Sequence, residues 1–367
     1  MPIYTEQKNG KTTYTVVATS RINGKQFNKK RRNVTSIAAA KRIELDLKLY
    51  LARMKEQPEM CTWTEWSEKC LNRMKLQFKG STVVNYQSNF NKWVNPVLGN
   101  KFLDEIKPSD IHSLIYDKIE GVSLEARHGV LKRLKRVFAM AVEDGIIARN
   151  PATGISVKVP ESPQQVLNRT EINTLLFEAK KQNHRYYNHW ALAILTGLRK
   201  GELIALTWSD IDFENRVISV TKSWGRIDGL GPTKSTKNRY VPISNELERF
   251  LKELRSQSNL NENKVLEQHE DWLYGDAAKA LKDFCREVGI TAVKFHDLRA
   301  TFITQMLLRG VPLAKVMKIV GHSTIKTTMR YLRLIAEDTQ GATEELGIVL
   351  PKTEEQGNLV SLFQVRV

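Results

Sequence analysis

Cysteine is scarce in this chain of 367 residues, which holds only Cys61, Cys70 and Cys285. Their spacing is not that of zinc ligands, and an odd number argues against a disulfide framework. Free cysteine is usually buried, so we interpret these residues as core side chains, with a reactive thiol as the alternative. The cysteine content therefore suits a reducing cytoplasm.

Long apolar runs are also absent. No stretch approaches the ~20 apolar residues that a membrane-spanning helix needs. The first residues, MPIYTEQKNGK, lack the apolar segment of a secretory signal peptide. We therefore expect a cytoplasmic protein with no membrane partner.

What the chain has in excess is positive charge. Its 57 Lys and Arg against 40 Asp and Glu give a net charge of +17, and residues 1–60 alone hold 13 basic against 5 acidic residues. Such an excess favours a polyanionic partner, with nucleic acid the first candidate and an anionic membrane surface the second. A hydrophobic content of 41% supports folded cores, and the length supports about two or three domains.

Residues 1–57 are predicted to form a small sheet followed by a helix. The run at 13–20 is β-branched and aromatic, Asn23-Gly24 offers a hairpin turn, and the chain returns over 25–36. Ser36 can cap a helix whose apolar residues recur every four positions. The returning strand carries a basic run, which is either a solvated hairpin edge or a phosphate-binding ribbon: Lys29, Lys30, Arg31 and Arg32.

After a linker at Pro58, residues 61–155 look wholly helical, with four candidate helices. The last of them, at 124–145, has an apolar stripe that we expect to be buried, formed by Leu131, Leu134, Phe138 and Ala141. Basic residues interleave with this stripe and must point elsewhere: Lys132, Arg133, Lys135 and Arg136. Their face of the helix can either dock on a DNA duplex or remain solvated.

A linker rich in Pro, Gly and Ser at 150–165 precedes a mixed segment at 166–345. Helices are predicted at 170–182 and 188–206, followed by a β-rich stretch with a Gly-rich turn and then by further helices. The final residues, 346–367, combine a polar spacer with a short apolar end, which can pack on its own domain or on a neighbouring molecule.

Two clusters in the third segment, at 196–212 and 296–331, suit the cleavage of a phosphodiester by a tyrosine. The phosphorane carries extra negative charge, so cationic donors must converge on it. Arginine is preferred because its planar fork binds phosphate oxygens bidentately. The nucleophile must lose a proton and the leaving 5′ oxygen must gain one. A covalent phosphotyrosine conserves the bond energy, so rejoining needs no ATP.

The first cluster supplies Arg199, flanked by glycines that allow the chain to turn, and Glu202, near enough to buttress a basic group. Lys234 lies in a predicted hairpin that could bring a proton donor into the site. Taken singly, each of these residues has an ordinary structural interpretation, because a lone arginine in a helix is usually a surface cation.

The second cluster supplies His296 and Arg299, which fall on one face of a helix because they are three residues apart. His322 precedes Ser323, a plausible N-cap, and would therefore lie at a helix N-terminus, where anions are favoured. Tyr331 follows two turns later. A metal site is the alternative for the two histidines, but no third ligand has suitable spacing, and Asp297 is interpreted as a cap or buttress.

Together, the motifs TGLRKGELIALTWSDID, KxxKxRxVPI, HDLRxTF and GHS, with a tyrosine nine residues beyond the last histidine, resemble the tyrosine recombinase (phage integrase) family over about 170–335. The resemblance implies a catalytic set of Arg199, Lys234, His296, Arg299, His322 and Tyr331. It implies that Tyr331 attacks a scissile phosphate and forms a 3′-phosphotyrosine, without metal or nucleotide cofactor. Ala300 departs from many members, which have a second histidine there, but that position is not catalytic.

The roles of the other residues follow from the same resemblance. Arg199, Arg299 and His322 would stabilise the phosphorane, and Lys234 would be the general acid toward the 5′ oxygen. His296 would assist proton transfer at the tyrosine, and Glu202 would orient the site.

The resemblance also implies a mixed, mainly α fold. Residues 1–57 would be an arm-type DNA-binding domain of three strands and a helix, 61–155 an all-α, SAM-like core-binding domain, and 166–345 the α+β catalytic domain. The tail at 346–367 would pack in trans. The basic residues of the hairpin and of the helix at 124–145 then become candidate DNA contacts.

The leading interpretation is an integrase of a mobile element such as a prophage. It would act as a homotetramer on paired double-stranded attachment sites, at the nucleoid of a bacterial host. A directionality factor and a host DNA-bending protein are candidate partners. The alternatives are a resolvase or invertase of the same family and a DNA-binding accessory protein without catalysis.

Overall fold

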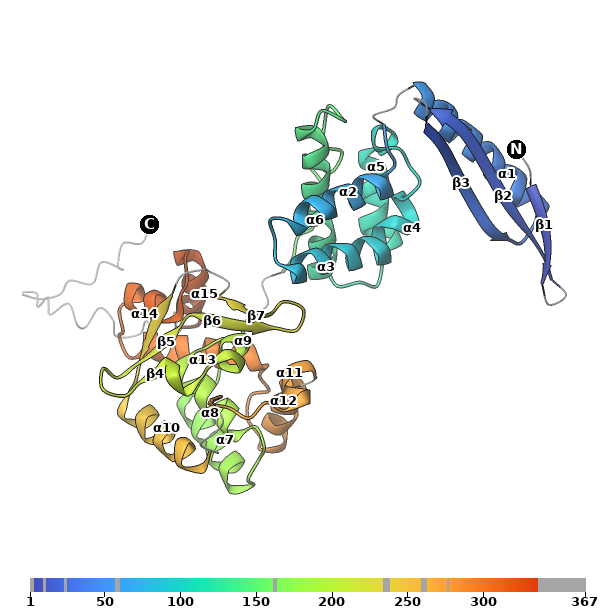
Figure 1. The fold of residues 1–367 in the computed structure, drawn as a ribbon. Coiled ribbons are helices and arrows are strands. Elements are labelled where there is room, and N and C mark those ends of the chain that lie inside the picture. Colours follow the sequence, from blue (N-terminus) through green and yellow to red (C-terminus); the bar gives the residue numbers. More distant parts are fainter. Residues whose placement is uncertain are drawn as a thin grey trace, which may run out of the picture. The chain divides into compact units, whose positions relative to one another are not determined.

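The computed structural model describes residues 3–8, 11–22, 25–56, 60–160, 164–233, 238–258, 263–275 and 277–335 (Figure 1). The chain divides into two compact units, Met1–Ser162 and Pro163–Val367. Four predicted features lie outside the described residues: the Asn23-Gly24 turn, Pro58, Lys234 and the tail at 346–367. Within the described ranges, no helix combines the length and apolarity needed to cross a bilayer. The fold is mixed and mainly helical, as the sequence predicts.

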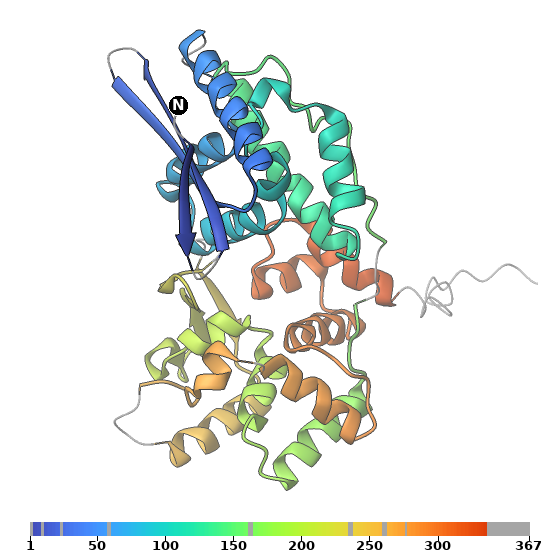
Figure 2. The same cartoon turned by 90° about the vertical axis from the view of Figure 1, so that its right-hand side faces the viewer.

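The first unit begins with the predicted sheet. Three antiparallel strands pair in the order β1 (Ile3–Lys8), β2 (Lys11–Ile22) and β3 (Lys25–Val34). Helix α1 (Ile37–Glu56) packs against β2 (Figure 2). Its first turn is capped by Ser36, whose hydroxyl accepts a hydrogen bond from the Ala39 N–H at 3.2 Å, so the predicted cap is confirmed.

The rest of the first unit is helical, with α2 (Trp63–Lys75), α3 (Gly80–Asn89), α4 (Asn95–Leu98), α5 (Pro108–Ser113) and α6 (Leu124–Glu143). A π-helical turn at Phe90–Val94 joins α3 to α4, and a second at Leu114–Lys118 continues α5. The apolar stripe predicted for α6 is buried throughout. It packs in one core with Trp63 and Trp66, and the Trp66 Nε1–H donates to the Val137 carbonyl at 3.0 Å.

The sheet segment is anchored to the helical part of this unit through Glu65. The Glu65 carboxylate accepts from Lys29 Nζ and from the Tyr50 hydroxyl, each at 2.7 Å. The Tyr50 ring stacks on Phe102 with centroids 5.3 Å apart. Burial opposes ionisation of Glu65, but the hydrogen bonds from Lys29 and Tyr50 outweigh it and lower the pKa to about 2. One member of the basic run is therefore already paired inside the protein.

The second unit is built mainly of helices: α7 (Arg169–Lys181), α8 (Tyr187–Thr196), α9 (Lys200–Ala205), α10 (Asn245–Gln257), α11 (Glu270–Tyr274), α12 (Ala277–Glu287), α13 (Phe295–Leu308), α14 (Leu313–Val320) and α15 (Ile325–Ile335). One small sheet has the order β4 (Ile211–Asp212), β5 (Val217–Val220) and β8 (Arg239–Pro242). A separate hairpin pairs β6 (Lys222–Gly225) with β7 (Gly229–Pro232).

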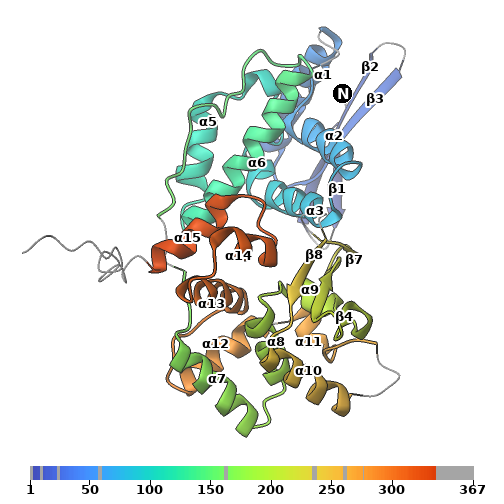
Figure 3. The same cartoon turned by 90° about the vertical axis from the view of Figure 1, so that its left-hand side faces the viewer.

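Helix α13 lies at the centre of this unit, in contact with α8, α12, α14 and α15 (Figure 3). Buried positions occur on several of its sides, and they include the polar residues Arg299, Thr301 and Thr304. A helix enclosed on several sides is apolar nearly all round. Arg299 and Thr301 have hydrogen-bond partners, as buried polar side chains usually do, whereas the Thr304 hydroxyl has none among the described residues.

The structure corrects the helix predicted at 188–206, which is divided into α8 and α9. Gly197 ends α8 in the left-handed conformation with φ 64°, which glycine adopts without strain. A side chain there would also collide with Phe302 of α13, because an added Cβ would lie 2.3 Å from its ring. Arg199 consequently stands at the start of α9 instead of within a continuous helix.

Candidate active site

Arg199 is the N-cap residue of α9 and is held by Glu202 in the first turn of that helix. The Arg199 backbone N–H donates to Glu202 Oε2 at 2.8 Å, and its Nη1 donates to Oε1 at 2.9 Å. The Glu202 side chain is 1% exposed, whereas that of Arg199 is 27% exposed. A buried carboxylate thus fixes an arginine that still reaches solvent, where it can contact a phosphate.

Arg239 of β8 completes this cluster, although the motif residues singled out for catalysis do not include it. Its guanidinium faces the Glu202 carboxylate, with Nη1 donating to Oε1 at 2.9 Å and Nη2 donating to Oε2. Its Nε–H donates to the Ile319 carbonyl at 3.0 Å. Burial opposes ionisation of Glu202, but Arg239 outweighs it and lowers the pKa of the carboxyl. The sequence signal for this residue was its place in the KxxKxRxVPI motif.

Arg299 of α13 joins the turn after α8 to the end of α14. Its Nη1 donates to the Gly197 carbonyl at 2.6 Å, and its Nη2 donates to the Val320 carbonyl. The residue is 2% exposed. Burial and the neighbouring Arg199 lower the pKa of Arg299 to about 9, so its charge persists at neutral pH. The two arginines therefore present positive charge from one buried and one accessible position.

His322 follows Gly321, which ends α14 in the left-handed conformation with φ 70°. Its Nδ1 lies 2.8 Å from the Thr328 hydroxyl. Burial, followed by the charges of Arg299 and Arg199, lowers the pKa of His322 to about 4, so the ring is neutral near pH 7. Helix α15 begins at Ile325, so the residue directly before it is Thr324 and not Ser323, where the cap was predicted.

Tyr331 lies on α15 and is 5% exposed. Its ring is nearly parallel to that of His322, with an angle of 14° and a centroid separation of 6.3 Å. Burial raises the pKa of Tyr331, and the charge of Arg299 only partly opposes this. The phenol is therefore protonated at neutral pH, and a nucleophilic attack by its oxygen requires a proton acceptor.

His296 and Arg299 share α13, as their spacing predicts. The His296 surface is accessible to solvent, yet desolvation by the surrounding protein and then the charge of Arg299 lower its pKa. Asp297 accepts the Lys294 backbone N–H at 2.8 Å, which confirms the interpretation of Asp297 as a cap. Ala300 is fully buried in the satellite core that also contains Tyr331.

The structure thus brings five of the six predicted catalytic residues into one electrostatic cluster, and the sixth, Lys234, lies outside the described residues. The cluster draws on the start of α9, on α13, on the turn before α15 and on α15 itself. Among the residues that the structure describes, no group of three His, Cys, Asp or Glu side chains is arranged to hold a metal ion. Such a site offers cations, neutral imidazoles and a phenol to a phosphodiester.

The predicted DNA contacts belong to the first unit and differ in exposure. Lys30, Arg31, Arg32, Lys132 and Arg136 are exposed, whereas Lys29, Arg133 and Lys135 are half-buried. Lys29 is paired with Glu65, and Arg133 donates to the Asn85 side chain while its guanidinium lies over the Tyr86 ring. The exposed residues remain the better candidates for contact with a phosphate backbone.

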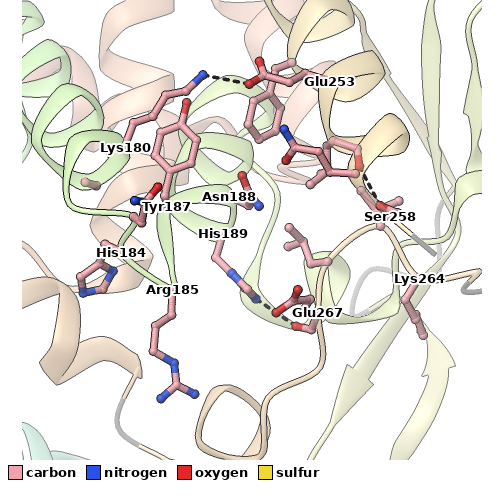
Figure 4. Close-up of a pocket in the computed structure, with 17 residues that line it drawn as sticks. Lys180, His184, Arg185, Tyr187, Asn188, His189, Glu253, Ser258, Lys264 and Glu267 are labelled. Carbon is pink, nitrogen blue, oxygen red and sulfur yellow. Dashed lines mark hydrogen bonds and ion pairs between the residues drawn. The ribbon is translucent and has the colours of Figure 1, made fainter.

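The second unit also contains a cavity of about 570 Å³, which is separate from the predicted catalytic residues (Figure 4). Side chains of α7, α8 and α10 line it together with the segment at 264–267. Two of its polar side chains already have partners within the protein: Lys180 Nζ lies 2.9 Å from Glu253 Oε1, and His189 Nε2 lies 3.1 Å from the Glu267 carbonyl oxygen. None of the predicted catalytic residues lines this cavity.

Comparison with protein families gives two matches along the chain. Residues 165–337 match the phage integrase family, and residues 62–119 match the phage integrase N-terminal SAM-like domain. A tyrosine recombinase XerC-like protein of Caldanaerobacter subterraneus is 31% identical over 314 residues, covering 74% of this chain and 79% of the relative. The ICEBs1 integrase of Bacillus subtilis is 26% identical over 270 residues, covering 67% and 72%.

Solved structures share the fold. The Tn1549 transposon integrase bound to transposon right-end DNA has a TM-score of 0.68 at 20% identity, covering 78% of this chain and all of that chain. A lambda integrase dimer bound to a core site has a TM-score of 0.58 at 18% identity, covering 96% of this chain and 97% of that chain. The second similarity extends over the N-terminal sheet as well as the helical and catalytic parts.

Proposed function

The chain belongs to the tyrosine recombinase (phage integrase) family, and from this premise we propose that it is a site-specific DNA recombinase that integrates and excises a mobile element. The observation that carries the proposal is the convergence of Arg199, Arg299 and His322 beside Tyr331. The charge of Arg299 acts on the protonated phenol of Tyr331, and the His322 ring lies nearly parallel to that of Tyr331 with centroids 6.3 Å apart. Arg199 in turn acts on Arg299 and His322. Phosphotyrosine chemistry requires such cations and donors close to the nucleophile.

In the proposed reaction the Tyr331 oxygen forms a bond to the scissile phosphorus, and the bond from phosphorus to the 5′ oxygen breaks. His296 accepts the phenolic proton, for which its neutral ring is suited because its pKa is lowered. Lys234 gives a proton to the departing 5′ oxygen. The incoming 5′ hydroxyl of another strand then reverses these steps and releases Tyr331.

During this exchange the two arginines and His322 bind the phosphate oxygens as negative charge develops. Arg199 is the accessible member, and Arg299 acts from a buried position where its charge is little screened. Glu202 holds the Arg199 side chain in place. The donors are fixed before the substrate arrives, so little reorganisation accompanies the attack.

A nicked suicide duplex tests the cleavage step. The duplex should carry the sequences that flank the element at its integration site, and the products are separated on a denaturing gel. We expect a covalent protein–DNA adduct with the wild type and none with Tyr331→Phe. Tyr240→Phe is the matched control, since Tyr240 is an exposed tyrosine of β8 that should leave adduct formation unchanged. Absence of an adduct with the wild type would refute the proposed chemistry.

We further propose that the first unit contributes most of the DNA-binding surface. Residues 1–57 would bind arm-type sites and 61–155 the core site, and charge reversal of Lys30 and Arg32 tests the first assignment. We expect weaker binding to arm-site DNA with unchanged binding to a core-site duplex. Asp46→Asn serves as a surface control in the same domain, since Asp46 is an exposed carboxylate of α1. An equal loss of affinity for both duplexes would contradict the assignment of arm-site binding to residues 1–57.

We also propose that the protein assembles as a homotetramer on paired sites. In this assembly, residues 346–367 of each protomer would pack on a neighbouring protomer. Removal of 350–367 should reduce assembly on DNA without preventing cleavage by single protomers. The alternative is a resolvase or invertase of the same family. Recombination between two separate plasmids would favour the integrase, whereas exchange confined to sites on one plasmid would favour the alternative.

A directionality factor or a DNA-bending protein is a further candidate partner. If either is needed, excision by the purified protein should require added host extract.

A further inference from the structure

The hydroxyl of Thr328 is a buried polar group beside the candidate active site. Thr328 is 0% exposed, although its neighbours Thr327 and Met329 on α15 are exposed. Its Oγ1 lies 2.8 Å from the Nδ1 atom of His322. Thr328 precedes Tyr331 by three residues, so both side chains lie on the same face of α15.

This contact bears on which nitrogen of His322 carries the proton. The ring is neutral near pH 7, and a neutral imidazole has one N–H donor and one acceptor nitrogen. If the Thr328 hydroxyl donates to Nδ1, the remaining proton resides on Nε2. If Nδ1–H instead donates to the hydroxyl oxygen, Nε2 presents a lone pair, which an anionic phosphate oxygen would repel.

Other contacts of His322 leave the proton's position undetermined. Its backbone N–H donates to the Met317 carbonyl at 3.0 Å, and Gly321 sets the chain direction through its left-handed conformation. Both fix the backbone without touching the ring nitrogens. Among the residues that the structure describes, the Thr328 hydroxyl is the one hydrogen-bond partner of a His322 ring nitrogen. Thr328 is therefore the side chain suited to select the tautomer.

We propose that Thr328 is a positioning residue that donates its hydroxyl hydrogen to Nδ1 of His322 and so holds the ring with Nε2–H available to the scissile phosphate. This inference rests on the proposed recombinase function. Because Thr328 and Tyr331 share one helix, docking of α15 places the nucleophile and sets the phosphate donor in a single event.

Two substitutions separate the hydroxyl from the volume of the side chain. Thr328→Val keeps the branched shape and removes the donor, whereas Thr328→Ser keeps the donor. In single-turnover cleavage at saturating protein, we expect Thr328→Val to slow adduct formation about 10- to 100-fold. This is less than the ~10²–10³-fold loss for deleting one transition-state donor, because His322 itself remains. The DNA affinity of Thr328→Val should stay within about twofold of the wild type, and Thr328→Ser should keep most of the wild-type rate. In a His322→Gln background, Thr328→Val should have no further effect, since the residues act through one contact.

The tautomer can be read directly from ¹⁵N spectra of full-length protein labelled at histidine, with His322 assigned by its loss in His322→Gln. We expect the Nε2–H form in the wild type and in Thr328→Ser, and a mixture of tautomers in Thr328→Val. An Nδ1–H ring in the wild type would overturn the inference. So would an equal rate loss from Thr328→Val with and without His322, which would identify a packing effect. If the wild type formed no adduct, the recombinase proposal would fail by itself, and the spectra would still decide the tautomer.

Discussion

Replacing Glu202 by glutamine should destabilise the second unit strongly, because the carboxylate is the only charge partner of a buried arginine in the described contacts. Its oxygens accept from the side chains of Arg199 and Arg239 and from the Arg199 backbone N–H. The Arg239 side chain is 5% exposed. Glutamine offers one acceptor oxygen, and its NH₂ group would face the arginine N–H donors.

The magnitude follows from the burial of the pair. Removing one partner of a buried ion pair costs about 3–5 kcal/mol, because the other charge stays buried without compensation. For a unit of this size a loss of 1 kcal/mol lowers the midpoint of thermal unfolding by about 2–4 °C, so we expect a decrease of about 6–20 °C. Glu246→Gln is the matched control, since that glutamate is 61% exposed and pairs with Arg249 on the surface of α10. Its loss should change stability by less than about 1 kcal/mol.

Differential scanning calorimetry of the full chain can resolve this effect. The transition of the second unit should shift, while that of the first unit should stay in place. Adding Arg239→Met to Glu202→Gln should recover part of the loss, because the uncompensated charge is then gone. A midpoint for Glu202→Gln within about 2 °C of the wild type would refute the reasoning that Glu202 neutralises a buried cation.

Four further outcomes are expected. In urea denaturation, Gly197→Ala should lower the free energy of unfolding more than Gly289→Ala does. Both glycines have positive φ, which costs alanine about 1–2 kcal/mol. Only a Cβ at position 197 would also collide with Phe302. Trp66→Ala should lower the unfolding free energy of the first unit by about 3–5 kcal/mol, measured from that unit's transition in scanning calorimetry. Burial lowers the pKa of His189 to about 4. The stability that the neutral His189 ring contributes is therefore complete above about pH 6.5 and is lost as the pH falls toward 4, by up to about 3 kcal/mol. His189→Gln should flatten this acid dependence of stability. DNA affinity should fall steeply with salt in a filter-binding titration, and a flat response would contradict phosphate neutralisation.

Local spacing made part of the site predictable. His296 and Arg299 share a helix turn, and the stripe of α6 is buried, because the helical period alone determines which residues share a face. The cap at Ser36 was equally predictable, since a capping side chain and its N–H partner are three residues apart. These features depend on neighbours within one or two turns.

Long-range contacts account for what the sequence left open. The division between α8 and α9 depends on Phe302, which approaches Gly197 from a helix formed about a hundred residues later. The glycines beside Arg199 allowed a turn, but glycine within a helical pattern costs only about 1 kcal/mol, so their presence alone did not establish that the helix ends there. Thr328 reaches His322 across a non-helical turn, where no period governs which side chains meet. Such pairings arise from tertiary packing and have no local signal.

The π-helical turns at Phe90–Val94 and Leu114–Lys118 have a consequence for comparing this chain with its relatives. A π-helical turn accommodates one additional residue within an α-helix. The flanking turns keep their faces toward the same core, as the burial of Val83 before the first π-helical turn and Leu98 after it illustrates. Relatives that lack the additional residue would have an uninterrupted helix here. Differences of one residue in length should therefore be aligned inside these helices, where gaps are ordinarily avoided, and not moved into the adjoining loops.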